Sequence, residues 1–140
     1  MPKIENVPQI AVELGTHRLP AKGSILIQIT DPDGEFVVPK FKDDFEHIVQ
    51  YKFYDVTAPL WGNDKLLEPI TQDQADFLVR ILEFALEMDY DVVVHCTAGL
   101  CRSGAVTEVG VIMGFDAVHD NRLPNVEVKS KMLRCLNESH

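Results

Sequence analysis

Residues 91–104 read DVVVHCTAGLCRSG, and this segment carries the strongest structural signal of the chain. Its run of three β-branched residues, 92–94, is typical of a parallel strand that is covered on both faces. A tight loop follows, and residues 103–113 then predict a helix that Gly114 ends. In folds built from parallel strands and helices, ligands bind beyond the carboxyl ends of the strands, so we expect the ligand site at this loop.

The rest of the chain extends the strand–helix order. Residues 24–29 and 48–54 predict strands, and residues 57–70, rich in turn-forming residues, predict a loop. A helix is expected from Thr71, which has Gln74 at capping-box spacing, and apolar residues then recur at helical spacing: Leu78, Ile81, Leu82, Ala85 and Met88. Residues 125–136 predict a closing helix. The pattern predicts an α/β fold, a single domain over residues 1–140, with a mostly parallel central sheet flanked by helices.

Composition limits the function classes. The chain has 140 residues, with 13 Lys and Arg against 22 Asp and Glu, a net charge of −9. Such a surface repels phosphate backbones, so we expect neither nucleic-acid nor membrane partners. The apolar runs are far shorter than the ~20 residues that span a bilayer. Three cysteines do not resemble a disulfide framework, which favours a cytoplasmic protein.

The loop after the valine strand has the chemistry of an anion site. Residues 97–102 can turn several backbone N–H groups inward, and Gly99 permits the backbone angles that this requires. The N-terminus of the following helix and the planar guanidinium of Arg102 favour the same anion. The same surroundings stabilise a thiolate, so we expect Cys96 to be a nucleophile at neutral pH.

The string from His95 to Ser103 resembles the signature of cysteine-dependent protein tyrosine phosphatases: His-Cys, five residues, Arg, then Ser or Thr. The wider pattern looks like the small dual-specificity phosphatases of bacterial and viral type, with FYDV at 53–56 before the helix and Leu123-Pro124-Asn125 after it. The resemblance covers roughly residues 24–136 and is most specific at the phosphate loop, which lies between a strand and a helix.

This resemblance implies a role for each matching residue. Cys96 is the nucleophile that takes the phosphoryl group, and Arg102 clamps the phosphate. Ser103 supports the departing thiolate, and His95 orders the loop and helps to favour the thiolate. The backbone amides of the loop form the phosphate cradle, which comprises Thr97, Ala98, Gly99, Leu100, Cys101 and Arg102. The resemblance implies no cofactor and no metal.

The sequence offers two candidates for the general acid. Asp55 follows the strand at 48–54 and matches the aspartate at a strand end in the family, but it lies 41 residues before Cys96, longer than the common interval. Asp64 lies 32 residues before Cys96. An insertion at 57–68 would explain the long interval and favour Asp55. We take Asp55 as the expected acid, with Asp64, or neither residue, as the alternatives.

Three further residues have two interpretations each. Trp61 is expected either to lie at the rim of the site, against an aromatic ring of the substrate, or to lie in the core. Asn125 either braces the active-site loop or caps a helix. Cys101 either fills space beneath the loop or forms a disulfide with oxidised Cys96. Cys135 is the alternative partner for that disulfide.

The sequence thus predicts a phosphatase for phosphotyrosine, with phosphoserine and phosphothreonine as possible additional substrates, acting on phosphorylated proteins or peptides. The alternatives are a phosphate-binding module without turnover and another phosphohydrolase of this type, acting on RNA 5′-phosphates or phosphoinositides. The loop interior, TAGLC, has no Lys or Arg, which disfavours highly charged substrates.

Overall fold

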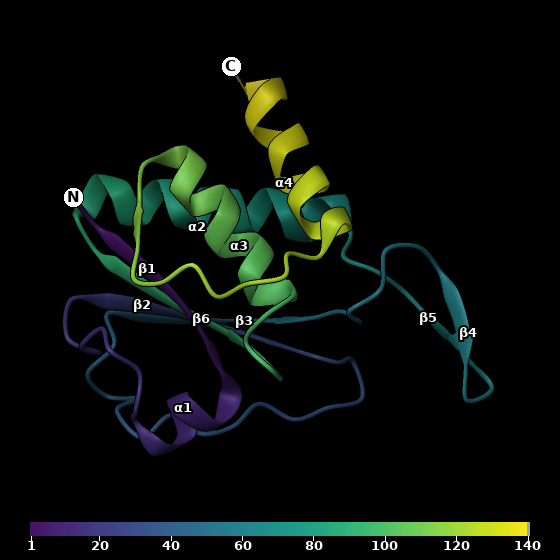
Figure 1. Cartoon of the computed structure of the whole chain (residues 1–140), viewed down its shortest axis with the longest axis horizontal. Helices are drawn as coiled ribbons and strands as arrows, with labels where there is room; N and C mark the ends of the chain where they lie inside the picture. Colours follow the sequence, from purple (N-terminus) through teal and green to yellow (C-terminus); the bar gives the residue numbers. More distant parts are fainter. Residues whose placement is uncertain (140) are drawn as a thin grey trace.

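A five-stranded sheet forms the centre of the protein in the computed structural model, which describes residues 1–139 (Figure 1). The strand order is β3-β2-β6-β1-β7, and each neighbouring pair is parallel. The bounds are Lys3–Pro8 (β1), Ser24–Thr30 (β2), His47–Lys52 (β3), Asp91–Cys96 (β6) and Asp116–Ala117 (β7). The expected α/β fold with a mostly parallel sheet is confirmed.

Helices cover both faces of this sheet. Helices α2, α3 and α4 lie on one face and the short α1 on the other (Figure 1). Their bounds are Gln9–Leu14 (α1), Gln72–Met88 (α2), Arg102–Met113 (α3) and Val126–Ser139 (α4). The capping box predicted at Thr71 is present, because its side chain accepts from the Gln74 N–H and the Gln74 side chain accepts from the Thr71 N–H.

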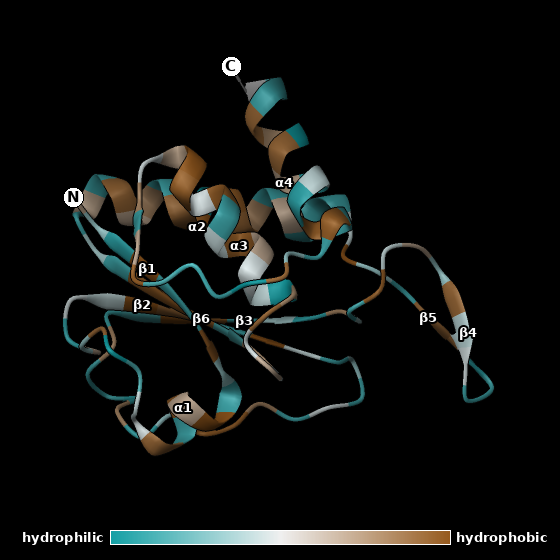
Figure 2. Cartoon of the chain, viewed as in Figure 1, coloured by the Kyte–Doolittle hydropathy of each residue, from teal (hydrophilic) through white to brown (hydrophobic). Residues whose placement is uncertain are grey.

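Successive residues of the central strands pack alternately into two hydrophobic cores, one on each face of the sheet. Ile25 and Ile27 of β2 pack with the layer of α2, α3 and α4, whereas Leu26 packs on the side of α1. All three valines at 92–94 are fully buried, which confirms that their strand is covered on both faces. The hydrophobic stretches of β2 and β6 meet at the middle of the fold (Figure 2).

The structure corrects the sequence-based expectation at the N-terminus, where β1 and α1 were not predicted. Strand β1 carries the polar residues Glu5 and Asn6, which hide its strand character although both are buried. The Glu5 carboxylate is satisfied there by the backbone N–H groups of Arg18 and Leu19.

The expected loop at 57–70 is also wrong in part, because it contains a two-stranded hairpin. Strands β4 (Leu60–Gly62) and β5 (Lys65–Leu67) pair antiparallel and project from the body of the protein (Figure 1). The connecting residues Asn63 and Asp64 both have positive φ, 52° and 62°, as the tight turns of hairpins require. Within residues 1–139, no helix is long and apolar enough to cross a membrane.

Candidate active site

The carboxyl ends of four neighbouring strands meet at one edge of the sheet. Cys96 is the last residue of β6 and Pro8 the last of β1, while Asp31 follows β2 and Phe53 follows β3 by one residue each. The order β3-β2-β6-β1 therefore brings residues from distant parts of the chain around the loop at 97–102. This is the edge at which the sequence predicts the ligand site.

The carbonyl groups of this loop are held by residues outside it. The carbonyl oxygens of Thr97 and Gly99 accept from the Gln9 N–H and the Asn6 side chain, and those of Leu100 and Cys101 accept from the N–H groups of residues 123 and 125. Because a trans peptide unit points its C=O and the next N–H in opposite directions, the N–H groups of residues 98 and 100–102 point the other way. The result is a nest that can receive an anion.

Gly99 is required at its position for two reasons. Its φ is +78°, in the left-handed region, and a Cβ there would lie 2.3 Å from the backbone nitrogen of Pro8 and from the carbonyl carbon of Val7. The loop thus lies directly on the end of β1.

Cys96 is the residue directly before this loop. Its Sγ is 3.2 Å from the hydroxyl oxygen of Ser103, and both side chains are buried. Helix α3 begins at Arg102, and its N-cap residue, Cys101, makes no side-chain capping bond. The first N–H groups of α3 and its positive dipole end are therefore directed at the loop.

Arg102 is buried and held on one side. Its Nη1 donates to Asp31 Oδ1 at 2.8 Å and to the Phe53 carbonyl at 2.7 Å. Its Nη2 lies 3.4 Å from the Thr97 hydroxyl, and within residues 1–139 nothing accepts from its buried Nε. The edge formed by Nε and Nη2 is thus the part of the guanidinium that is available to an anion.

His95 is fully buried directly before the nucleophile candidate. Burial lowers the pKa of His95 from 6.5 to about 4, and the positive charge of Arg102 acts in the same direction. The imidazole is therefore neutral at pH 7. Its Nδ1 lies 3.3 Å from the Cys96 carbonyl oxygen, so it remains able to order the strand end.

Asp55 and Asp64 lie in different places. Burial raises the pKa of the Cys101 thiol, and the neighbouring Asp55 carboxylate, with which the thiol hydrogen-bonds, raises it further. Asp55 also accepts a 2.7 Å hydrogen bond from Asn125 Nδ2. The structure thus places Asp55 beside the loop, whereas Asp64 is in the turn of the projecting β4–β5 hairpin. This hairpin lies within residues 57–68, the segment where an insertion would explain the long interval between Asp55 and Cys96.

Both interpretations of Asn125 are confirmed. Its Oδ1 accepts from the N–H groups of Glu127 and Val128 as a helix cap, and its own N–H donates to the Cys101 carbonyl. Trp61 is 73% exposed on the hairpin, so its expected core placement is wrong.

No family model matches the chain, and no curated protein matches it in sequence. The human tyrosine phosphatase-like serine/threonine/tyrosine-interacting protein matches in structure with a TM-score of 0.61 and 15% identity, over 94% of this chain and 89% of that one. Tk-PTP in its active form matches with a TM-score of 0.51 and 15% identity, over 96% and 80%. The chain has the fold of the cysteine-dependent tyrosine phosphatases.

The tyrosine phosphatase fold thus carries the sequence signature at the loop where the carboxyl ends of its strands meet. One of the two structural relatives is named phosphatase-like and the other is a phosphatase in its active form, so the fold by itself does not decide turnover. That question depends on the residues around Cys96.

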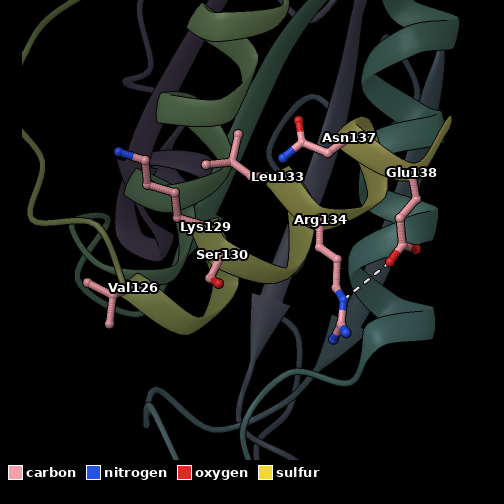
Figure 3. Close-up of a pocket in the computed structure, with 7 residues that line it drawn as sticks. All are labelled: Val126, Lys129, Ser130, Leu133, Arg134, Asn137 and Glu138. Atoms are coloured by element: carbon pink, nitrogen blue, oxygen red, sulfur yellow. Dashed lines mark ion pairs between the residues drawn. The ribbon is translucent and has the colours of Figure 1, made fainter. Parts of the chain in front are cut away.

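The surface has several hollows, and one of them is lined in part by Ala98, Gly99 and Leu100 of this loop. The pocket in Figure 3 is on α4, where Leu133 and the ion pair of Arg134 with Glu138 line it, and it contains no candidate site residue. A smaller hollow runs from Asp55 to Leu60 along the segment that leads into the hairpin. In the part of the chain that the structure describes, no group of three His, Cys, Asp or Glu residues could hold a metal ion.

Two residues of the site were not found from the sequence. Asn6 holds the Gly99 carbonyl at 2.7 Å, and Asp31 contacts Arg102. The position of Asp31 directly after a predicted parallel strand was the available signal. Asn6 had none, because β1 itself was not predicted.

Proposed function

We propose that this chain is a protein phosphatase that hydrolyses phosphotyrosine through a cysteinyl-phosphate intermediate, with phosphoserine and phosphothreonine as further candidate substrates. The observation that carries the proposal is the position of Cys96, whose Sγ is 3.2 Å from Ser103 Oγ, directly before a nest of inward N–H groups beside the Arg102 fork. A site that only binds an anion does not require a nucleophile beside it, and a cysteine that only fills the core does not require an anion nest. The combination of the two therefore favours a phosphatase.

In the first step, the Cys96 thiolate attacks the phosphorus atom and the bond to the leaving oxygen breaks. The inward N–H groups and the Nε–Nη2 edge of Arg102 stabilise the charge on the phosphoryl oxygens in the transition state. Asp55, exposed beside the loop, donates the proton that the leaving oxygen requires.

In the second step, a water molecule attacks the phosphocysteine, and the Asp55 carboxylate accepts its proton. The thiolate of Cys96 is then the leaving group. The hydroxyl of Ser103 donates a hydrogen bond to the departing sulfur and stabilises its negative charge, which restores the enzyme and releases inorganic phosphate.

Phosphorylated proteins or peptides fit this site better than polyanionic substrates. Arg102 is paired with Asp31, the loop interior carries no other cation, and the chain has a net charge of −9. Inositol phosphates and RNA 5′-phosphates require additional positive charge. A thiolate nucleophile also favours a reducing compartment such as the cytoplasm.

A phosphate-binding domain without turnover is the second candidate, because the human structural relative is named as a phosphatase-like interacting protein. Release of phosphate from para-nitrophenyl phosphate and from phosphotyrosine peptides, without added metal, distinguishes the two. We expect turnover by the wild type and by Cys135→Ser, which changes a cysteine of α4 outside the loop.

Cys96→Ser should bind inorganic phosphate and lose turnover, because a hydroxyl is not ionised at neutral pH. Acid quenching of the wild type with radiolabelled substrate should trap label on the peptide that contains Cys96. Phosphate binding by the wild type with no turnover of any of these substrates would establish the second candidate instead.

A further inference from the structure

The Asp31 carboxylate contacts the phosphate-clamping arginine from the side away from the nest. Asp31 Oδ1 lies 2.8 Å from Arg102 Nη1, and the Phe53 carbonyl lies 2.7 Å from the same nitrogen. Both acceptors come from strand ends far from the loop in sequence, after β2 and β3. Together they fix one nitrogen of the guanidinium and leave the opposite edge to the ligand.

The free edge has the geometry that a phosphate requires. The Nε and Nη2 hydrogens of a guanidinium are parallel and match two oxygens of one phosphate. Within residues 1–139, Nε is buried without an acceptor, although a buried polar group without a partner is costly. Nη2 has only the Thr97 hydroxyl at 3.4 Å, in the cradle itself. These two nitrogens point to an oxyanion as their partner.

The two side chains of this pair differ in burial. The Arg102 side chain is 5% exposed and that of Asp31 is 44% exposed. A buried guanidinium pays a large desolvation penalty and needs a fixed acceptor. Without Asp31, the Phe53 carbonyl is the one remaining acceptor that the structure gives Nη1, so one of the two hydrogen bonds that orient this nitrogen is lost.

We propose that Asp31 is a positioning residue that holds Nη1 of Arg102 so that the Nε–Nη2 edge faces the phosphoryl group. This rests on the proposed function, because it assigns the arrangement of the same cradle. Asp31 itself touches neither the substrate nor the reacting atoms.

Two substitutions of Asp31 distinguish its role in positioning Arg102 from the effect of its negative charge. Asp31→Asn and Asp31→Ala remove the same negative charge, but only Asn keeps an oxygen that accepts from Nη1. We expect the kcat of Asp31→Ala to be about tenfold or more below that of Asp31→Asn, the order expected for a displaced transition-state donor. Asp31→Ser, whose hydroxyl is too short to reach Nη1, should behave as Asp31→Ala does. The thermal midpoint of each variant confirms folding.

The leaving-group dependence distinguishes Asp31 from the general acid. Asp31→Ala should slow para-nitrophenyl phosphate and phenyl phosphate by the same factor, because it affects the phosphoryl clamp rather than the proton transfer. Asp33→Asn is the matched control, since that neighbouring carboxylate pairs with Lys65 of the hairpin. It should retain the wild-type rates.

Calorimetric binding of inorganic phosphate tests the inference without turnover. Asp31→Ala should bind phosphate several-fold more weakly than Asp31→Asn, even if the wild type hydrolyses nothing and the proposed function fails. Equal rates and equal phosphate affinities for Asn and Ala would overturn the positioning role. A selective loss on the poor leaving group would also overturn it, because Asp31 would then act in proton transfer.

Discussion

The side-chain nitrogen of Asn125 donates a 2.7 Å hydrogen bond to Asp55 Oδ1, which joins the segment after β3 to the start of α4. The backbone N–H of the same Asn125 donates to the Cys101 carbonyl in the phosphate loop. One residue therefore sets the distance between the candidate acid and the loop that holds the candidate nucleophile. This arrangement gives Asp55, rather than Asp64, a fixed position at the site.

We expect Asp55→Asn to slow phenyl phosphate far more than para-nitrophenyl phosphate, because a good leaving group hardly needs a proton. Steady-state kinetics with both substrates measures this difference. Asp64→Asn, in the hairpin turn, should leave both rates unchanged, and the opposite pattern in these two variants would assign the acid to Asp64.

Asn125→Asp tests the link between the acid and α4. The carboxylate can still cap the N–H groups of Glu127 and Val128, but it offers no donor to Asp55 and places a like charge beside it. We expect the stability to change little and the rate on phenyl phosphate to fall about tenfold or more. An unchanged rate would show that Asp55 keeps its position without this hydrogen bond.

Gly99→Ala should destabilise the protein and weaken phosphate binding. The left-handed backbone costs an alanine about 1 kcal/mol, and the clash of its Cβ with the end of β1 adds to this penalty. Gly23→Ala is the matched control, since Gly23 has φ +85° with open space around it and carries the backbone cost alone. Urea denaturation of both variants compares the two. Equal losses would mean that the loop moves away from β1 at no cost.

The buried His95 should make stability depend on pH. The unfolded chain takes up the proton near pH 6.5 and the folded chain near pH 4, so this contribution is present above pH 6.5 and is lost as the pH falls toward 4. The corresponding loss between pH 7 and pH 5 is about 2 kcal/mol. Urea denaturation at the two pH values should show this loss in the wild type and in His47→Gln, which changes an exposed histidine. His95→Gln should lack it, and an equal loss in that variant would assign the pH dependence to other groups.

Peroxide should inactivate the protein, and a dithiol should restore it. The Cys96 thiolate is oxidised to a sulfenic acid, which then condenses with the Cys101 thiol to a disulfide and releases water. Because burial and Asp55 raise the pKa of Cys101, the condensation should be faster at higher pH.

Cys101→Ser should lose activity in peroxide like the wild type and recover poorly, while Cys135→Ser should recover fully. Peptide mapping of the oxidised wild type identifies the partner of Cys96. Recovery of Cys96 only as sulfinic or sulfonic acid would show that Cys101 fills space and has no resolving role.

Short sequence patterns predict the parts of this protein whose contacts are local in the chain. The valine run at 92–94 specified a strand covered on both faces, and the capping box at Thr71 specified the start of α2. The residue pattern from Cys96 to Ser103 indicated an anion nest, because such a nest is formed by a single loop and the start of the helix that follows it. These features depend on residues within a few positions of one another.

The surroundings of this loop depend on how distant strands are arranged in the folded protein. Asp31 and Phe53 reach Arg102, and Pro8 limits Gly99 to glycine, because the strand order β3-β2-β6-β1 places four strand ends at one edge. Strand β1 was not predicted, because its buried polar residues do not look like those of a core strand. Their hydrogen-bond partners lie elsewhere in the chain. The choice between Asp55 and Asp64 likewise depends on a hairpin that projects away from the sheet. Strand order brings residues together at any sequence separation, so no local pattern specifies these contacts.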